Sequence, residues 1–379
     1  MIIQSKNIWL NDTFTPAQIE LQGQKIQVIY AYNEKKADKD YGDKRIIPGM
    51  IDVHCHGGLG FDTNDGEPEG LKMWSKGLLQ EGITSFCPTT VTQSEEVLTK
   101  AVANVAAVKE AGNPEGAEIL GIHFEGPYLN VKRKGAQPEQ FIVTPNVEQF
   151  KHYQDAAHGL IKIITVACEN DPDYALTHYC RDTNVNASLG HSCATYEQAL
   201  DAFQNGAHGV THTFNGMDEM THRAPGIPGA VMMSDDIYCE LICDGNHVAW
   251  PVMKALISAK GKDHVIMIDD ALRAKGCKPG NYDLGGQEIE IHENGGAYLK
   301  GTNTLAGGTM KFNQGLKNLI ETVKIPVDWA INMSSWNAAR YLHVDDRKGK
   351  IAQGYDADIV VLNDDYSVEQ VYAMGTERK

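Results

Sequence analysis

The alternation of apolar and polar positions changes character along the chain. Near the N-terminus, IQVIY (26–30) repeats apolar side chains at every second position, which is typical of a strand with one buried face. The stretch 349–375 has similar β character at the other end of the chain. From about residue 49, short apolar runs alternate instead with longer helical patterns. The pattern therefore predicts β-rich ends around a mixed α/β middle.

Two helices of that middle segment have clear boundaries. Residues 92–112 repeat apolar side chains at helical spacing and reach a stop signal at Gly112. Residues 195–206 open with Thr195 and Gln198, spaced as in a capping box, and end at a glycine. Between the helical patterns come short apolar runs at 118–127, 160–169, 185–191, 208–216, 239–245 and 264–271. Strands alternating with helices in this number predict an α/β fold with a closed, TIM-like (β/α)₈ barrel.

Composition and charge limit the classes of function. The 379 residues carry a net charge of −16, which argues against nucleic acid as a partner. A small phosphorylated substrate is still compatible, because it needs only a few local cations. No apolar run approaches the ~18 residues of a membrane helix, and the start MIIQSKNIWLND does not resemble a secretion signal. Eight scattered cysteines without a C-x-x-C pair suggest reduced thiols, so we expect a cytoplasmic protein without a membrane partner.

The expected strands end in residues that can do chemistry. These strand-end residues are His56, Glu125, His191, His212, Asp244 and Asp270. In parallel α/β barrels, catalytic groups gather at the carboxyl ends of the strands. Each residue alone could be a loop residue or a satisfied buried polar group, but their common position predicts one site.

The run PGMIDVHCHGG (48–58) raises the question of a metal. Strict strand alternation would place Asp52, His54 and His56 on one face, although strand-end histidines also occur in ordinary polar loops. Glu125 could be a turn cap, His191 a hydrogen-bonding residue at a helix start and His212 a core histidine. Together, those three could instead supply the His and carboxylate ligands of a catalytic metal that keeps one position open for water.

Two adjacent aspartates follow the run VIMI. Asp270 could act as general base and then general acid towards a water that a metal activates. Asp269 has the opposite strand parity, and we expect it to be structural, for example as a helix cap. If its side chain turned inward, it would raise the pKa of Asp270.

Read in order, these motifs resemble a known family. PGMIDVHCHGG, GIHFEGPYLN, SLGHS, GVTHTFNGM, APGIPGA, LICDGNHV, IDDALRAKG, TLAGGTM, NAAR and GYDADIVVL together resemble the metal-dependent amidohydrolase superfamily. The narrower resemblance is to its N-acetylglucosamine-6-phosphate deacetylase branch. It implies a (β/α)₈ catalytic barrel at 49–344 and a small β-sandwich domain formed jointly by residues 1–48 and 345–379. It also implies hydrolysis of a phosphorylated N-acetyl amino sugar to acetate and the free amine.

The resemblance further implies roles for individual residues. Glu125, His191 and His212 would hold the principal metal, His54 and His56 would join a second metal where one is bound, and Asp270 would be the acid/base. One or two divalent ions per chain are expected, zinc first, with iron, manganese or cobalt as alternatives. The implied substrate-binding residues are Ala136, Gln137, Asn215, Gly216, Arg223, His247, Leu305, Ala306 and Gly307. Arg223 would reach the phosphate in the neighbouring subunit, which implies a homodimer.

Three alternatives stay open from the sequence. Gln137 stands where some relatives carry a histidine that polarises the amide carbonyl, so the oxyanion would depend more on the metal. The substrate could be the galacto epimer, N-acetylgalactosamine-6-phosphate, or another amide. The chain could also be a catalytically silent scaffold of the same fold, although such scaffolds usually lack a ligand or the acid/base.

Overall fold

A ring of parallel strands forms the centre of this computed structural model, which describes residues 1–293 and 295–379. One sheet has the order β10–β9–β6, and a second runs from β11 in sequence to β16, with every pair parallel. Isolated parallel bridges from Thr89, just after β9, to His123 and from Cys55 of β6 to Ala271, just after β16, connect the two sheets, which fits the predicted TIM-like barrel. The strands are β6 (Met50–Cys55), β9 (Ile83–Pro88), β10 (Glu118–Ile119), β11 (Ile122–Glu125), β12 (Ile161–Val166), β13 (Asn186–Leu189), β14 (Gly209–Val210), β15 (Tyr238–Ile242) and β16 (Val265–Ile268).

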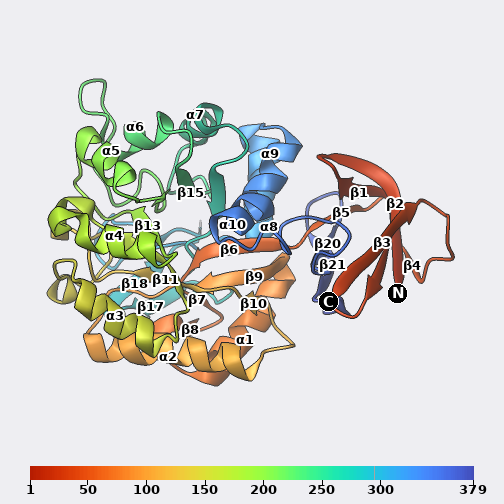
Figure 1. The fold of residues 1–379 in the computed structure, drawn as a ribbon, viewed down its shortest axis with the longest axis horizontal. Helices are drawn as coiled ribbons and strands as arrows, with labels where there is room; N and C mark the ends of the chain where they lie inside the picture. The colour runs from red at the N-terminus through yellow and green to blue at the C-terminus, as the bar shows by residue number, and fades with distance from the viewer. Residues whose placement is uncertain (294) are drawn as a thin grey trace.

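Helices surround this ring (Figure 1). They are α1 (Pro68–Leu78), α2 (Glu95–Ala111), α3 (Val147–Ala156), α4 (Ala175–Asp182), α5 (Tyr196–Gln204), α6 (Gly226–Met232), α7 (Trp250–Lys260), α8 (Phe312–Lys317), α9 (Val327–Ile331) and α10 (Asn337–Tyr341). Both helices predicted with boundaries are confirmed. Helix α2 stops at Gly112 (φ 77°), and the capping box of Thr195 and Gln198 opens α5. Within the described ranges, no helix has both the length and the apolar content needed to cross a membrane.

The two ends of the chain meet in another sheet, which lies beside the barrel (Figure 1). Its order is β22–β21–β20–β5–β1–β2–β3, with β4 beside β1, and the antiparallel pair of β5 and β20 joins the N-terminal strands to the C-terminal ones. Its side chains form a separate apolar cluster around Ile3, Ile19 and Ile359. The strands are β1 (Ile2–Leu10), β2 (Thr13–Gln22), β3 (Lys25–Ala31), β4 (Lys39–Asp40), β5 (Arg45–Pro48), β20 (Ile359–Leu362), β21 (Val368–Ala373) and β22 (Thr376–Glu377).

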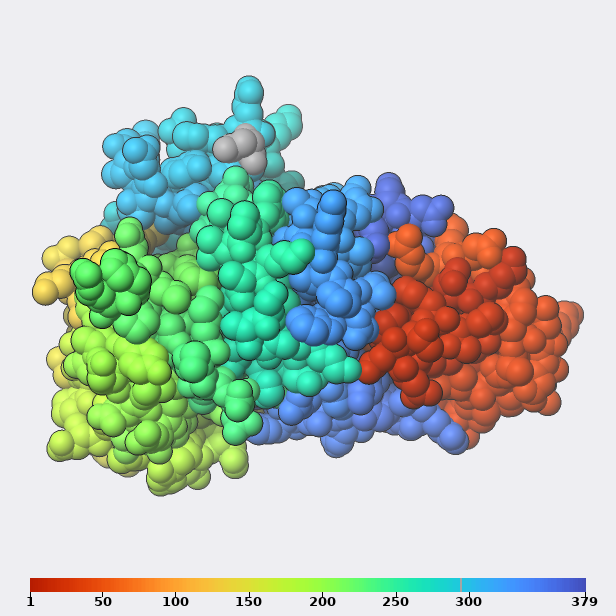
Figure 2. All heavy atoms as spheres, turned by 90° about the horizontal axis from the view of Figure 1, so that it is seen from above, coloured from red at the N-terminus to blue at the C-terminus, as the bar shows by residue number. Residues whose placement is uncertain are grey.

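A small antiparallel sheet follows the last barrel strand, and the sequence patterns did not predict it. It consists of β17 (Gly280–Leu284), β18 (Gln287–Ile291) and β19 (Ala297–Leu299), and Figure 2 shows this segment standing out from the barrel. Leu284 and Ile289 pack in one apolar cluster with Leu272 and Ala306. This packing places the chain around residue 306 at the mouth of the barrel. A further short hairpin, β7 (Gly57–Gly58) and β8 (Phe61–Asp62), follows β6.

Candidate metal centre and active site

The strand-end residues converge at one rim of the barrel. Glu125 is the last residue of β11, whereas His191, His212 and Asp270 each lie two residues beyond their strands. His191, His212 and Asp270 have positive φ angles of 46°, 28° and 48°. Non-glycine residues rarely adopt this conformation, and such strain is concentrated at functional sites. These turns direct three of the predicted residues into the centre of the rim.

Glu125, His191 and His212 form the tightest cluster. Glu125 Oε1 lies 3.0 Å from His212 Nε2 and 3.2 Å from His191 Nε2, and the two nitrogens are 3.1 Å apart. His191 Nδ1 lies 2.8 Å from the backbone oxygen of Arg133. Because that carbonyl can only accept, Nδ1 carries the proton and Nε2 presents a lone pair to the cluster.

His54 and His56 complete a second cluster on the same Glu125. His56 Nε2 lies 3.3 Å from Glu125 Oε2 and 3.1 Å from Asp270 Oδ1. His54 Nε2 lies 3.5 Å from Glu125 Oε1 and 3.3 Å from Asp270 Oδ1. The sequence-predicted catalytic residue and all five predicted metal ligands are thus brought together.

Asp52 does not share this face, so the expectation from strict alternation is wrong. The register of β6 against β9 shifts between Asp52 and Cys55, and Val53 packs in the same apolar cluster as Ile51. The irregularity brings His54 to the site, whereas the Asp52 carboxyl lies buried near Asp269. Burial and the charge of Asp269 raise the pKa of Asp52 well above its usual range.

The donor set fits divalent metal. Glu125 with His191 and His212, and Glu125 with His54 and His56, each place their ligand atoms within 4.8 Å of one another. His54 Nε2 is buried without a hydrogen-bond partner among the described residues, although two carboxylates lie close to it. A lone pair that faces carboxylate oxygens is repelled unless a cation lies between them. Imidazole nitrogen and carboxylate oxygen are the ligands that such cations take from proteins.

The pKa values of the cluster's side chains also indicate that it favours the binding of a cation. Burial alone would lower the pKa values of His56 and His212. Bonds and charges from Glu125 and Asp270 outweigh it, raising the pKa of His56 well above its usual range and that of His212 to about 9. Burial alone would raise the pKa of Asp270, but the charges of His54 and His56 lower it to about 2. The buried carboxylates therefore create a potential that attracts positive charge.

The Asp269 carboxylate is bonded to Lys275 and does not turn towards Asp270, so the condition under which it would raise the pKa of Asp270 is not met. Lys275 Nζ bonds the Asp269 carboxylate and lies 2.7 Å from Glu81. The buried ammonium thus compensates the charge of Asp269. Asp269 Oδ1 accepts a hydrogen bond of 2.9 Å from the backbone N–H of Ala271, and no described helix begins there, so Asp269 caps a turn and not a helix.

A pocket of about 300 Å³ opens above the cluster. Eight of the nine predicted substrate-binding residues line it, namely Ala136, Gln137, Asn215, Gly216, His247, Leu305, Ala306 and Gly307. Gly308 N donates to the backbone oxygen of Asp270, and Leu272 N donates to that of Gly308, so the 305–307 segment is fixed to the chain beside Asp270. Arg223 is exposed and does not line this pocket.

Two of the pocket's side chains are already oriented by neighbours. Gln137 Nε2 donates a 2.6 Å hydrogen bond to Glu125 Oε2, so this residue holds a candidate ligand in place. His247 Nδ1 lies 2.7 Å from Asp244 Oδ2, which fixes the ring and leaves Nε2 for a ligand. Burial alone would raise the pKa of Asp244, but the bond from His247 lowers it.

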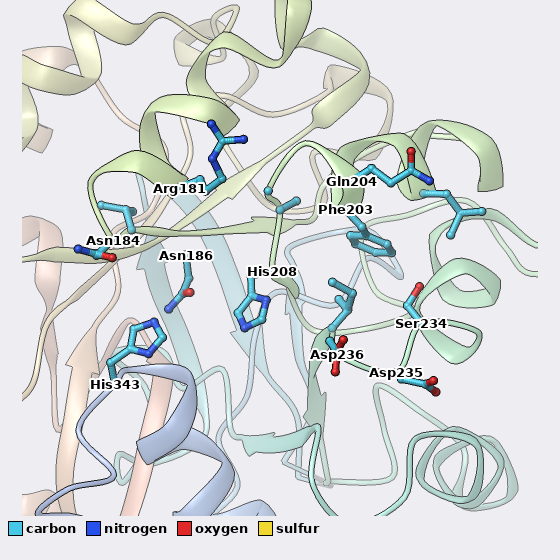
Figure 3. A pocket seen from close by; sticks show the side chains of 15 residues that line it. Arg181, Asn184, Asn186, Phe203, Gln204, His208, Ser234, Asp235, Asp236 and His343 are labelled. Carbon is cyan, nitrogen blue, oxygen red and sulfur yellow. The ribbon is translucent and has the colours of Figure 1, made fainter.

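A larger cavity of about 580 Å³ lies elsewhere, at the amino ends of the strands (Figure 3). Asn186 is the first residue of β13 and His208 directly precedes β14, and both line it together with His343. None of the candidate metal groups found among the described residues involves its lining. In barrels of this type, the amino-terminal face contributes to stability and the opposite face to catalysis.

Sequence reasoning missed several residues of the site. Gly135, Phe214, Leu284 and Thr304 line the pocket, and they carry no chemical signal that a motif could reveal. Glu240 was also missed, although it contacts His54. A carboxylate within the apolar run of β15 was the signal that could have found it.

Comparison with known proteins agrees with this geometry. Residues 45–378 match the model of the amidohydrolase family. An N-acetylglucosamine-6-phosphate deacetylase of Bacillus subtilis (strain 168) is 40% identical over 86% of this chain and 82% of its own length. An N-acetylgalactosamine-6-phosphate deacetylase of Escherichia coli O157:H7 is 33% identical over 87% of this chain and 86% of its own.

A solved structure extends the similarity to the whole chain. A variant of the Mycobacterium smegmatis N-acetyl-D-glucosamine-6-phosphate deacetylase, in complex with N-acetyl-D-glucosamine-6-phosphate, superposes with a TM-score of 0.94 at 28% identity. The match covers 100% of this chain and 99% of that one. The chain therefore belongs to the amidohydrolase family, in the branch that contains the amino-sugar 6-phosphate deacetylases.

Proposed function

We propose that this chain hydrolyses N-acetylglucosamine-6-phosphate to glucosamine-6-phosphate and acetate. The observation that carries the proposal is the meeting of Glu125, His191, His212, His54, His56 and Asp270 at the base of one pocket. The relatives named above, which act on phosphorylated N-acetyl amino sugars, support the substrate class.

Glu125, His191 and His212 would hold the principal divalent ion, with His54 and His56 beside a second. When bound, the ion would polarise the amide carbonyl and lower the pKa of water towards ~7. We propose zinc first, at one or two ions per chain, with iron, manganese or cobalt as alternatives for the same ligand types.

Asp270 would move the proton. Its carboxylate accepts a proton from the attacking water as the water oxygen bonds to the acetyl carbon. It then returns this proton to the amide nitrogen as the C–N bond breaks, which yields the free amine and acetic acid, and the acid loses its remaining proton to solvent as acetate. The position of Asp270 suits this role, because its Oδ1 lies 3.1 Å from His56 Nε2 and 3.3 Å from His54 Nε2, at the candidate metal ligands.

The pocket residues would bind the rest of the substrate. His247, with its ring held by Asp244, suits a sugar hydroxyl or a phosphate oxygen. Gln137 has a second amide hydrogen for the developing oxyanion, beyond the one that Glu125 accepts. Asn215 and Gly216 would contact the sugar and phosphate, and residues 305–307, together with Ala136, would lie along the sugar.

A second copy of the chain would complete the phosphate site. Among the described lining residues, no lysine or arginine faces the pocket, whereas a phosphate dianion needs a cationic partner. Arg223 lies in an exposed segment near the exposed side chain of Met220. We propose a homodimer in which Arg223 of each chain reaches the phosphate in the active site of the other.

The proposal extends to the domain organisation and the location of the protein. Residues 1–48 and 345–379 would form a β-sandwich domain, and residues 49–344 the catalytic barrel. Support comes from the separate apolar cluster of the terminal sheet. We propose a cytoplasmic location, because a charged sugar phosphate does not cross a lipid bilayer unaided and all eight cysteines are free thiols.

Metal removal tests the proposed chemistry. Protein treated with a chelator should lose acetate release from N-acetylglucosamine-6-phosphate, and added zinc should restore it in proportion to the ions bound. Undiminished acetate release from metal-free protein would refute the proposed role of Glu125, His191 and His212. A chain that binds metal but releases no acetate would instead be a different amide hydrolase or a silent scaffold.

A further inference from the structure

Glu240 lies inside the barrel below the candidate metal centre, and none of the proposed steps uses it. It belongs to β15, and only 2% of its surface is exposed. A carboxylate buried this deeply is costly unless donors surround it. Its contacts therefore indicate what it does.

Two donors meet at a single oxygen of Glu240. Glu240 Oε2 lies 2.8 Å from His54 Nδ1 and accepts a hydrogen bond of 3.2 Å from the backbone N–H of His212. Both donors belong to predicted metal-binding residues, one from β6 and one from the turn after β14. Glu240 thus ties together the two halves of the candidate centre from below.

The contact with His54 determines which ring nitrogen carries the proton. An ionised carboxylate can only accept, so Nδ1 of His54 carries a proton, and in the neutral ring that a metal ligand requires Nε2 keeps its lone pair. That lone pair points towards Glu125 Oε1 and Asp270 Oδ1, which lie 3.5 and 3.3 Å away. Without Glu240, the ring could place its proton on Nε2 and donate to those carboxylates, which would block the position of a cation.

His123 lies beside His54 without competing for Glu240. Its ring packs edge-on against His54, with centroids 4.4 Å apart. Its Nδ1 lies 3.1 Å from the backbone oxygen of Val53, and its Nε2 lies 2.8 Å from the Thr165 hydroxyl. Since the Val53 carbonyl can only accept, His123 Nδ1 donates to it and does not compete for Glu240, whose Oε1 lies 3.8 Å away.

We propose that Glu240 is a positioning residue that holds His54 as the Nδ1–H tautomer and thereby determines how tightly the chain binds its second metal ion. The inference rests on the proposed metal centre and deepens it. Carboxylates that accept from a ligating histidine typically strengthen metal binding about 10- to 100-fold. Glu240 Oε2 bonds the backbone N–H of His212 and not its ring, so the affinity for an ion that Glu125, His191 and His212 would hold should change little.

The test compares metal affinity in the full chain and in Glu240→Gln, by competition of zinc against a chelator. Glutamine keeps the size of the side chain but replaces the carboxylate with a neutral amide, which accepts from Nδ1–H more weakly and can present its NH₂ group there instead, so the hold on this tautomer is weakened. We expect one tightly bound ion as in the unsubstituted chain and a second ion held about 10- to 100-fold more weakly. If Glu240→Gln bound both zinc ions as tightly as the unsubstituted chain does, the proposal would be overturned.

Thr165→Val is the matched control. It removes a buried polar contact inside the same barrel, but from His123 and not from His54. We expect a lower melting temperature with both zinc affinities unchanged. If Thr165→Val weakened the second ion as much as Glu240→Gln, general loosening of the barrel would explain the effect, and the proposal would be overturned.

A spectroscopic measurement keeps the test decisive if Glu240→Gln does not fold. Long-range ¹H–¹⁵N spectra of the unsubstituted chain, with His54 assigned through His54→Asn, should show the Nδ1–H tautomer. The Nε2–H tautomer would overturn the proposal. So would a further ion coordinated by His54, His123 and Glu240, whose ligand atoms also lie within 4.8 Å of one another, because it would replace the Nδ1 proton.

These readouts are independent of turnover. A chain without deacetylase activity that still shows the expected ratio of zinc affinities would refute the proposed function and leave the role of Glu240 intact. If the unsubstituted chain were active but Glu240→Gln left both zinc affinities unchanged, the proposed function would stand and the role of Glu240 would be refuted.

Discussion

The side-chain amide of Gln137 bonds Glu125 through its nitrogen and the backbone of Thr92 through its oxygen. Its Nε2 donates to Glu125 Oε2 at 2.6 Å, and its Oε1 accepts from the backbone N–H of Thr92 at 2.7 Å. Of the three candidate metal groups, the two proposed to hold the ions include Glu125, so this glutamine orients the carboxylate that they share.

Replacing Gln137 with leucine should weaken metal retention. The leucine fills a similar volume but leaves Glu125 Oε2 without its donor, so we expect about 10- to 100-fold weaker zinc binding. Zinc content after dialysis against a chelator measures this. Gln149→Leu is the control, because Gln149 makes the same kind of bond to Glu95 on the exposed surface. Equal zinc retention in both variants would contradict an orienting role.

Asp270→Asn should separate proton transfer from metal binding. Asparagine has nearly the same shape but cannot accept the proton of water, so we expect kcat to fall about 10²- to 10⁴-fold. The zinc content should stay that of the unsubstituted chain, because Glu125 and the histidines are intact. Steady-state rates of acetate release, normalised to bound zinc, measure the effect. Turnover within a few fold of the original would remove Asp270 as the acid/base.

Arg223 offers a test of shared active sites. Arg223→Ala should raise KM for the phosphorylated sugar far more than for the unphosphorylated one, because the phosphate loses a charge-assisted bond. Co-expressed Arg223→Ala and Asp270→Asn chains should recover part of the activity. In such a mixed dimer, one site combines an intact Asp270 with the partner's intact arginine. No recovery in mixed dimers isolated with two different affinity tags would contradict the exchange of Arg223 between chains.

The ion pairs of Glu118, where the barrel meets the C-terminal segment, should make part of the free energy of unfolding depend on pH. It lies on β10 and accepts two bonds from Arg347, at 2.8 and 3.0 Å, and Lys348 Nζ lies 2.6 Å away. Burial alone would raise the pKa of Glu118, but these partners lower it to about 2 from the usual 4.5. A lowered pKa stabilises the folded state fully above about pH 4.5, and this contribution is lost as the pH falls towards 2.

Glu118→Gln should therefore reduce the free energy of unfolding by about 3 kcal/mol at pH 7, and by progressively less below pH 4.5. Urea unfolding at several pH values measures the difference. Glu115→Gln is the control, because Glu115 pairs with Lys76 in an exposed position, and it should have little effect at any pH. A difference for Glu118→Gln that does not shrink in acid would contradict the linkage.

The sequence predicted the barrel and the site where chemistry and periodicity coincide. Local signals revealed helices with capping residues, such as α2 and α5. They also revealed polar residues at strand ends, such as Glu125 and His212. Asp52 could not be placed, because the irregularity in β6 depends on pairing with β9. The sheet β17–β19 and the contact between Lys275 and Asp269 also depend on tertiary packing, which no single stretch of sequence contains.

The measurement that tests the central claim most directly is acetate release by protein of known metal content from three sugars. These are N-acetylglucosamine-6-phosphate, its galacto epimer and unphosphorylated N-acetylglucosamine. The account predicts metal-dependent turnover with the highest kcat/KM for N-acetylglucosamine-6-phosphate. A higher kcat/KM for the galacto epimer would reassign the substrate within the same chemistry. No acetate from either phosphorylated sugar, with metal bound, would contradict the account.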